Sequence, residues 1–379
     1  MDRRRFLGAL AWGCSAAASP LLTPVTLASA PWDARLVVVV LRGAMDGLDA
    51  VRPAFDPAFA GLRPTLRGGG LPVEGGWELH PALAPLLPLW ERGEAGAVHA
   101  VSTPYRDRRS HFDGQDILEA GSGGSDLEGV RDGWLNRLLQ AVPGVATETA
   151  FALGRENMLI LQGREAVGRW SPDARLVLSP QARRLMMAVQ HDDPLFRPAL
   201  EEALDIVDGL AGEERGGGAL AVAEFAARRL REETRIASFS LPGWDTHAGQ
   251  EAGLGRALGR LAEVVLALRE GVGEAVWART GVLCVTEFGR TARENGTGGT
   301  DHGTGGAMLF AGGALRGGRV VADWPGLADL YADRDLLPTR DLRAHAAWAM
   351  RGLWGVERGV LEGAVFPGLE MGGDPGLAP

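Results

Sequence analysis

The most regular pattern in the chain is a set of short apolar runs that are rich in β-branched residues. The strongest run, at 35–41, reads RLVVVVL and has no polar residue after its first position. A continuous run of this kind is typical of a strand that is covered on both faces, as in a parallel sheet. We therefore expect five strands, at residues 35–41, 95–101, 236–241, 281–286 and 307–311.

Between these runs, apolar residues recur at helical spacing. We expect helices over 219–231, 254–270 and 340–353, and another that runs through Trp134 and Leu139 and is capped by Asp132. Strands that alternate with helices imply a doubly wound α/β fold built in layers. We expect residues 31–379 to form one such domain.

Three segments break the alternation. Residues 49–88 are rich in proline and glycine, which indicates an excursion over the ends of the sheet. Residues 209–218 (GLAGEERGGG) indicate a flexible break between two helical pieces. Residues 150–200 are less regular, and we expect them to form a small cap on the domain.

The N-terminus has the pattern of a twin-arginine export signal, with Arg3 and Arg4 preceding Arg5, Phe6 and Leu7, and then an apolar stretch. The alternative is a basic N-terminal arm, against which the apolar stretch argues. We expect residues 1–30 to be the signal, with Ala28-Ser29-Ala30 or Ala16-Ala17-Ala18 as the cleavage site. The protein would then pass through the twin-arginine translocase to the periplasm or the cell exterior. No later apolar stretch reaches the 18 residues of a membrane span.

Composition excludes several classes of protein. The formal net charge is −9, and every cationic side chain belongs to arginine, scattered along the chain. This distribution gives no footprint for nucleic acid. The expected mature chain keeps one cysteine, Cys284, so a disulfide framework is impossible and stability must come from the core.

Acidic and histidine side chains follow three of the expected strands. Asp46 follows the first strand, Asp245 and His247 follow the run at 236–241, and Glu287 follows the run at 281–286. In open α/β sheets, ligands bind outside the carboxyl ends of the strands. We therefore expect these side chains to meet at one edge, where oxygen and nitrogen donors could hold a divalent metal.

Each of these residues also has an ordinary structural alternative. Asp46 could cap a helix or a turn. Asp245 and His247 share one face of an extended segment, so they could bind one ion or could form a hydrogen-bonded pair that orders the loop. Glu287 could pair with Arg290.

Two further segments carry candidate ligands. Asp301 and His302 lie among glycines in GGTDHGTGG, where the backbone can approach a ligand closely or where the loop could be mobile. His111 follows Ser110 and an arginine cluster that includes Arg109. A hydroxyl beside a metal can become a nucleophile, and arginine can hold phosphate or sulfate oxygens. Alternatively, Ser110 is a helix N-cap beside solvated arginines.

Several longer stretches together resemble the DUF1501 family: VVVVLRGAMDGLDAVRP, RSHFDGQDILEAG, GWDTHAGQ and TEFGRTARENGTGGTDHGTGG. These are exported bacterial proteins of unassigned function, related in fold to alkaline phosphatases and sulfatases. The resemblance covers nearly the whole mature chain. It implies a three-layer α/β sandwich with a mostly parallel central sheet flanked by helices.

The wider superfamily implies a two-metal hydrolase of phosphate or sulfate esters. By this resemblance, Ser110 is the candidate nucleophile, and Asp46, Asp245, His247, Glu287 and His302 resemble the metal ligands. Phe288 stands where the superfamily has a further histidine ligand. Either His111 or Asp301 supplies that ligand, or the second metal is lost.

Two functions follow as expectations. The first is hydrolysis of a small anionic ester with zinc, manganese, calcium or magnesium, in which Arg109 or Arg290 steadies the anion. The second is a non-catalytic periplasmic or surface binding protein on a degenerate hydrolase fold, with a surface polymer as a possible partner. Phe288 favours the second function.

Overall fold

The computed structural model describes residues 32–106, 108–123, 132–172 and 218–378. The expected export signal, residues 173–200 of the expected cap, and residues 209–217 of the glycine-rich break lie outside the described residues. Within the described part of the chain, no helix has the length and apolar character needed to cross a membrane.

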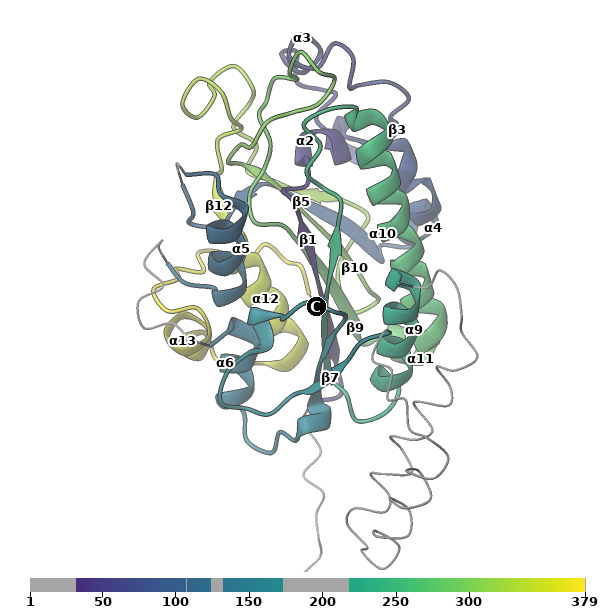
Figure 1. Ribbon diagram of the computed structural model, residues 1–379, viewed down its shortest axis with the longest axis vertical. Coiled ribbons are helices and arrows are strands. Elements are labelled where there is room, and N and C mark those ends of the chain that lie inside the picture. The colour runs from purple at the N-terminus through teal and green to yellow at the C-terminus, as the bar shows by residue number, and fades with distance from the viewer. Residues whose placement is uncertain (1–31, 107, 124–131, 173–217, 379) are drawn as a thin grey trace, which may run out of the picture.

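The described strands form a main sheet in the order β11-β5-β10-β9-β1-β8-β6-β7, with β12 also paired to β5 (Figure 1). Their bounds are β1 Arg35–Arg42, β5 Ala95–Ser102, β6 Ala150–Leu153, β7 Gly168–Trp170, β8 Ile236–Pro242, β9 Thr280–Val285, β10 Gly306–Ala311, β11 Val320–Val321 and β12 Arg340–Asp341. All five expected strands are present. The described part of the expected cap contributes β6 and β7 to this sheet.

The sheet is mostly parallel, as predicted. β1 pairs in parallel with β8 and β9, and β6 pairs in parallel with β7 and β8. β10 is antiparallel to both of its neighbours, β5 and β9. The chain returns from β9 to β10 through a loop without a helix, and it enters β10 at the edge of the sheet where β9 ends. This loop, residues 286–305, therefore lies across the carboxyl end of β9.

Helices cover both faces of the sheet, which gives the expected three layers (Figure 1). On one face lie α4 Leu87–Glu91, α9 Gly218–Leu230, α10 Gln250–Val272 and α11 Glu274–Trp277. On the other lie α5 His111–Ala120, α6 Trp134–Gln140, α12 Leu342–Trp354 and α13 Arg358–Val360. β1 alternates between the two cores, with Val37 and Val39 facing α9 and α10 and Val38 facing α6 and α12. The central strand is thus buried on both faces, which explains its continuous apolar run.

The excursion at 49–88 carries small elements at one end of the sheet. They are α2 Gly47–Ala50, α3 Phe59–Leu62 and a second sheet of β2 Val51–Arg52, β4 Glu78–Leu79 and β3 Leu71–Pro72. One predicted cap is wrong. α6 begins after Gly133, and the Asp132 carboxylate instead accepts a hydrogen bond from Gln140.

A buried histidine in α12 gives a prediction about acid stability. Neither ring nitrogen of His345 has a hydrogen-bond partner among the described residues, and burial lowers its pKa to about 3. An unfolded chain takes up a proton near pH 6.5, so the stabilising contribution is complete above that pH and is lost as the pH falls toward 3. Between pH 7 and pH 5 this one group should destabilise the wild type by about 2 kcal/mol.

Substituting His345→Leu should remove this contribution, because leucine fills a similar volume and takes up no proton. The measurement is the free energy of unfolding in urea at pH 7 and pH 5 for both proteins. We expect the difference between the two pH values to be smaller in the variant. An equal difference in both proteins would contradict the prediction.

Candidate metal centre

The carboxyl edge of the main sheet brings together side chains from three segments: the one after β8, the β9–β10 loop and the start of α5. Asp245 and His247 follow β8, and Glu287 follows β9. His302 lies in the loop that leads into β10, whose amino end is at the same edge because β10 is antiparallel. His111 opens α5, the helix that follows β5. Of the four side chains predicted to meet at this edge, Asp245, His247 and Glu287 do so, together with His302 and His111; Asp46 is described below.

Three imidazoles surround the Asp245 carboxylate. Its Oδ1 lies 3.1 Å from His247 Nε2 and 3.2 Å from His302 Nε2, and its Oδ2 lies 3.4 Å from His111 Nε2. The His111, Asp245 and His302 donor atoms all lie within 4.8 Å of one another, the only group of this kind found among the described residues. We call His111, Asp245, His247 and His302 the donor cluster.

The other nitrogen of each ring is held by an acceptor. His111 Nδ1 lies 2.8 Å from Glu287 Oε1, and His247 Nδ1 lies 2.9 Å from Asp301 Oδ1. His302 Nδ1 lies 2.8 Å from the main-chain carbonyl oxygen of Arg109. Carboxylate and carbonyl oxygens only accept, so each Nδ1 must donate a proton. A ring that is neutral therefore turns an Nε2 lone pair toward the cluster, as metal-binding histidines do.

This arrangement requires a positive charge at its centre. His247 Nε2 and His302 Nε2 are 3.0 Å apart, and two lone pairs at that distance repel each other unless a proton or a cation lies between them. His111 Nε2 is buried and has no hydrogen-bond partner in the described part of the protein. An orphaned nitrogen beside two opposed nitrogens and a carboxylate fits a metal ion better than it fits a hydrogen-bonded loop.

The carboxylates around the cluster are ionised at neutral pH. Burial opposes ionisation of Asp245, but the hydrogen bond and the charge of Arg290 lower its pKa overall. Burial likewise opposes ionisation of Glu287, but the hydrogen bonds that it accepts from His111, Gln115 and main-chain amides together outweigh burial and lower its pKa. The hydrogen bond from His247 lowers the pKa of Asp301. Asp245 is thus available as a ligand, while Glu287 and Asp301 orient imidazoles.

The glycine loop is packed rather than loose. A Cβ atom at Gly299 would lie 2.4 Å from the main chain of His247, and one at Gly303 would lie 2.4 Å from the main chain of Arg290. Only glycine permits such close approach of two backbones. These contacts fix the main chain on both sides of Asp301 and His302.

Arg290 does not pair with Glu287. Its guanidinium is fully buried, with Nη1 2.7 Å from Asp245 Oδ1 and the other nitrogens bonded to the hydroxyl and carbonyl oxygens of Thr300. Its donors are therefore committed to protein partners, and the geometry assigns it to holding Asp245 rather than a substrate anion.

We expect Arg290→Met to lower the affinity for zinc by about tenfold to a hundredfold, because Asp245 loses the partner that fixes its orientation. The zinc affinity of Arg290→Lys should lie between those of Arg290→Met and the wild type, because lysine keeps the positive charge but lacks the planar, forked arrangement of donors. Competition with a chromogenic chelator measures both. Unchanged affinity in Arg290→Met would refute this role.

Asp46 lies beside the donor cluster rather than in it. Its carboxylate is fully buried, pairs with Arg63 at 2.7 Å and 3.2 Å, and accepts from Gln250 and Thr300. It also accepts from Asp49 N as the N-cap of α2. Thr300 and Arg290 separate it from Asp245. Asp46 is therefore a helix cap, the structural alternative given above, and the Arg63 guanidinium rather than a metal ion neutralises its carboxylate.

Ser110 is the N-cap of α5, with Oγ 3.5 Å from Asp113 N. Its own amide donates to the Tyr105 hydroxyl at 2.9 Å. Arg109, at a positive φ of 51°, lies 3.0 Å from the buried carboxylate of Asp335. Phe288 is buried and stacks against the His111 ring at 5.2 Å between centroids, so it forms a wall of the cluster.

Some functional neighbours were not predicted from the sequence. Arg63 and Asp335 neutralise Asp46 and Arg109, and Gln115 donates to Glu287 Oε1 at 3.1 Å. Gln115 lies one helical turn after His111, so the i, i+4 spacing was a usable signal. Arg63 and Asp335 lie in irregular segments far from their partners in sequence, where no spacing rule applies.

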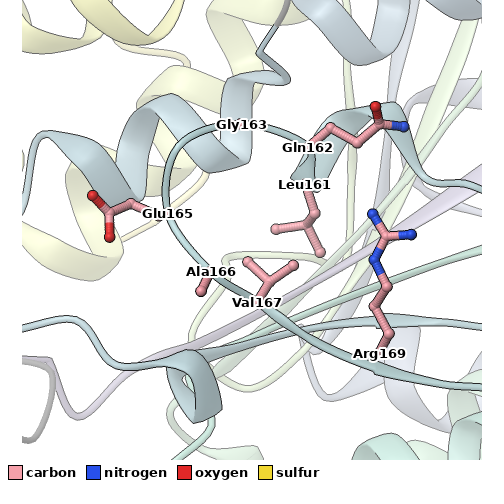
Figure 2. Close-up of a pocket in the computed structure, with 7 residues that line it drawn as sticks. All are labelled: Leu161, Gln162, Gly163, Glu165, Ala166, Val167 and Arg169. Carbon is pink, nitrogen blue, oxygen red and sulfur yellow. The ribbon is translucent and has the colours of Figure 1, made fainter.

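A separate cavity of ≈ 350 Å³ lies along the loop from Leu161 to Arg169 (Figure 2). It contains none of the predicted site residues and is lined by Leu161, Gln162, Gly163, Glu165, Ala166, Val167 and Arg169. The predicted chemistry is therefore not located there.

Residues 96–350 match the family model described as protein of unknown function (DUF1501), and the chain belongs to this family. The matched region contains the whole donor cluster, Glu287 and Asp301, whereas Asp46 precedes it. No curated protein matches the chain.

Three solved structures are similar to the chain at low identity. The C-terminal periplasmic domain of EcEptC from Escherichia coli is 10% identical over 74% of this chain and 72% of that one, with a TM-score of 0.34. BT1596, a 2-O GAG sulfatase, is 9% identical over 75% and 65%, with a TM-score of 0.36. A TAB5 alkaline phosphatase mutant with bound Mg is 10% identical over 75% and 92%, with a TM-score of 0.35.

Proposed function

We propose that this protein is an exported, metal-dependent hydrolase of phosphate or sulfate esters with a single metal ion. One observation carries the proposal: three imidazoles, each with its Nδ1 held by an acceptor, turn Nε2 toward the carboxylate of Asp245. The resemblance of the sequence to the alkaline phosphatase and sulfatase superfamily supports the reaction class.

The donor set favours zinc among the four candidate metals. Three imidazole nitrogens and one carboxylate suit zinc, whereas magnesium and calcium prefer oxygen ligands and manganese prefers sets richer in oxygen. A bound divalent ion supplies Lewis-acid chemistry, which neutralises charge on an ester oxygen and lowers the pKa of a nearby hydroxyl. A second ion has no evident place, because Arg63 already neutralises Asp46.

Ser110 is our candidate nucleophile. It directly precedes the ligand His111, and its hydroxyl makes only a long cap hydrogen bond of 3.5 Å, which costs little to break. Rotation about χ1 would free Oγ to form a bond to phosphorus or sulfur while the bond to the leaving oxygen breaks, and the hydroxyl proton would pass through water to that leaving oxygen. Attack by a water molecule would then break the new bond to Ser110, restore its hydroxyl and release the anion. The α5 N-terminus and the partly exposed guanidinium of Arg109 would hold the anion.

A test of this function begins with protein purified without chelator. Elemental analysis should give about one divalent ion per chain. Chelation should abolish turnover of aryl phosphate or aryl sulfate esters, and zinc should restore it. Bound metal should also raise the melting temperature, because a ligand of the folded state stabilises that state. The proposal fails if no ester is hydrolysed with any of the four metals supplied.

A non-catalytic binding protein is the second candidate. Phe288 occupies the place where the resemblance implies a further ligand, and Arg63 neutralises Asp46, so the described residues offer no second set of metal ligands. Under this alternative the protein binds metal, and an anionic ligand such as a surface polymer, without turnover. The assay above separates the two candidates directly.

We also propose export through the twin-arginine pathway to the periplasm or beyond, on the basis of the N-terminal sequence. Replacing Arg3 and Arg4 with lysine should leave the precursor in the cytoplasm, because recognition depends on the arginine pair. Cell fractionation followed by immunoblotting measures this. Normal recovery of the variant outside the cytoplasm would overturn the pathway.

A further inference from the structure

The charged groups around the donor cluster do not balance one another. Arg290 pairs with Asp245, Glu287 holds His111, and Asp301 holds His247. Two more arginines lie next to His302. The main-chain carbonyl oxygen of Arg109 accepts from His302 Nδ1, and the Arg334 guanidinium donates to the His302 carbonyl oxygen at 2.7 Å.

Arg109 and Arg334 share one carboxylate. Asp335 Oδ2 lies 3.0 Å from Arg109 Nη2, and Asp335 Oδ1 lies 3.4 Å from Arg334 Nη1. The Asp335 side chain is fully buried, whereas those of Arg109 and Arg334 are partly exposed. This triad therefore leaves one positive charge beside His302.

The neighbouring buried network adds no further charge. Arg63 pairs with Asp46 and Arg52 pairs with Asp49, and Gln250 bridges the two carboxylates. A divalent ion and three arginines bring five positive charges to the cluster, and four carboxylates bring four negative charges: Asp245, Glu287, Asp301 and Asp335. Counting these groups, which the contacts above link to the donor cluster, the loaded site carries one net positive charge. Asp113 and Arg108 lie beside Tyr105 with opposite charges and leave this sum unchanged.

We infer that this site selects singly charged esters, namely sulfate monoesters or phosphate diesters, over the doubly charged phosphate monoesters. The inference rests on the proposed function and narrows its substrate. The attraction of an anion to the site rises in proportion to its charge, whereas the cost of removing it from water rises with the square of its charge. One net positive charge therefore suits one negative charge.

The direct test is binding of two unreactive anions of the same shape. Phenylsulfonate carries one charge and phenylphosphonate carries nearly two at pH 8. Calorimetry on the zinc-loaded full chain should give a dissociation constant at least about fivefold lower for phenylsulfonate, the effect of about one unit charge in a solvated site. Tighter binding of phenylphosphonate, or no binding of either anion, would overturn the inference.

A charge variant sharpens this test. Asp301→Asn keeps an oxygen that accepts from His247 Nδ1 but raises the net charge by one, so it should move the ratio of the two constants toward phenylphosphonate by about fivefold. The matched control is Glu270→Gln. Helix α10 begins at Gln250, beside the cluster, and Glu270 is an exposed residue near its other end. At a rise of 1.5 Å per residue, Glu270 is about 30 Å from Gln250. A ratio that moves equally in both variants would contradict a local effect.

Turnover assays distinguish the two kinds of singly charged ester, sulfate monoesters and phosphate diesters. They also test the proposed hydrolase activity separately from the charge preference. The assay compares 4-nitrophenyl sulfate, bis(4-nitrophenyl) phosphate and 4-nitrophenyl phosphate, each corrected for its uncatalysed rate. A larger rate enhancement for the sulfate or for the diester supports the inference and identifies the source. A larger rate enhancement for 4-nitrophenyl phosphate would contradict the inference but would still support the proposed hydrolase function. If none is hydrolysed, the hydrolase fails, and the binding ratio decides the inference alone.

Discussion

Replacing His302 with alanine is expected to lower the affinity for zinc by at least about a hundredfold, the upper range for losing a group that only orients a ligand. The loss of zinc affinity in His302→Ala should exceed that range, because His302 Nε2 faces both Asp245 and His247 and is itself a proposed ligand. A centre left with two imidazoles and one carboxylate has one protein donor fewer with which to hold the ion. Competition with a chromogenic chelator gives the dissociation constant.

The same variant should lose the metal-dependent rise in melting temperature. In the wild type, zinc at a hundred times its dissociation constant stabilises the folded state by about 2.7 kcal/mol. His302→Ala should melt at nearly the same temperature with zinc as with chelator. The control is His345→Leu, which removes an imidazole from α12 and should keep the full shift. Equal metal shifts in wild type and His302→Ala would exclude the donor cluster as a metal site.

A graded result distinguishes ligands from orienting groups. Asp301→Ala leaves all four proposed ligands in place and removes only the acceptor for His247 Nδ1. It should cost about tenfold to a hundredfold in affinity, less than the loss of His302. If Asp245 and His247 were only a hydrogen-bonded pair that orders the loop, Asp301→Ala and His302→Ala could change stability but neither would change metal affinity.

The sequence was a good guide to the sheet because its strands are buried on both faces. β1, β8 and β9 lie in the middle of the sheet, and a strand in that position must be apolar at nearly every residue. The direction of β10 was not predictable in the same way. Its run of apolar residues is compatible with either orientation, and the loop that decides it is polar and glycine-rich.

The location of the site was predictable for the same reason, since Asp245 and Glu287 each follow a buried strand. The roles within the site were not. Glu287 and His111 are 176 residues apart, and only the fold shows that one orients the other. Arg63 neutralises Asp46 from within a proline-rich excursion. A carboxylate's role depends on its nearest cation, and that contact is tertiary.

Ser110→Ala is expected to reduce ester turnover by at least about a thousandfold if Ser110 is the nucleophile, because a covalent path is lost entirely. The hydroxyl lies next to His111, and its bond to Asp113 N is too long at 3.5 Å to hold it firmly. The Ser110 amide is held separately by Tyr105, so the main chain should keep its position in the variant. Metal affinity should therefore stay near the wild-type value.

Loss of the helix cap alone predicts a different outcome. An N-cap serine replaced by alanine costs about 1 kcal/mol of stability, and a weak cap costs less. Asp341→Ala is the matched control, because Asp341 caps α12 through Arg343 N at 2.9 Å and lies outside the donor cluster. That variant should lose stability and keep its turnover. A Ser110→Ala protein that melts slightly lower and turns over ester at the wild-type rate would make Ser110 a cap and would move the search for a nucleophile to water.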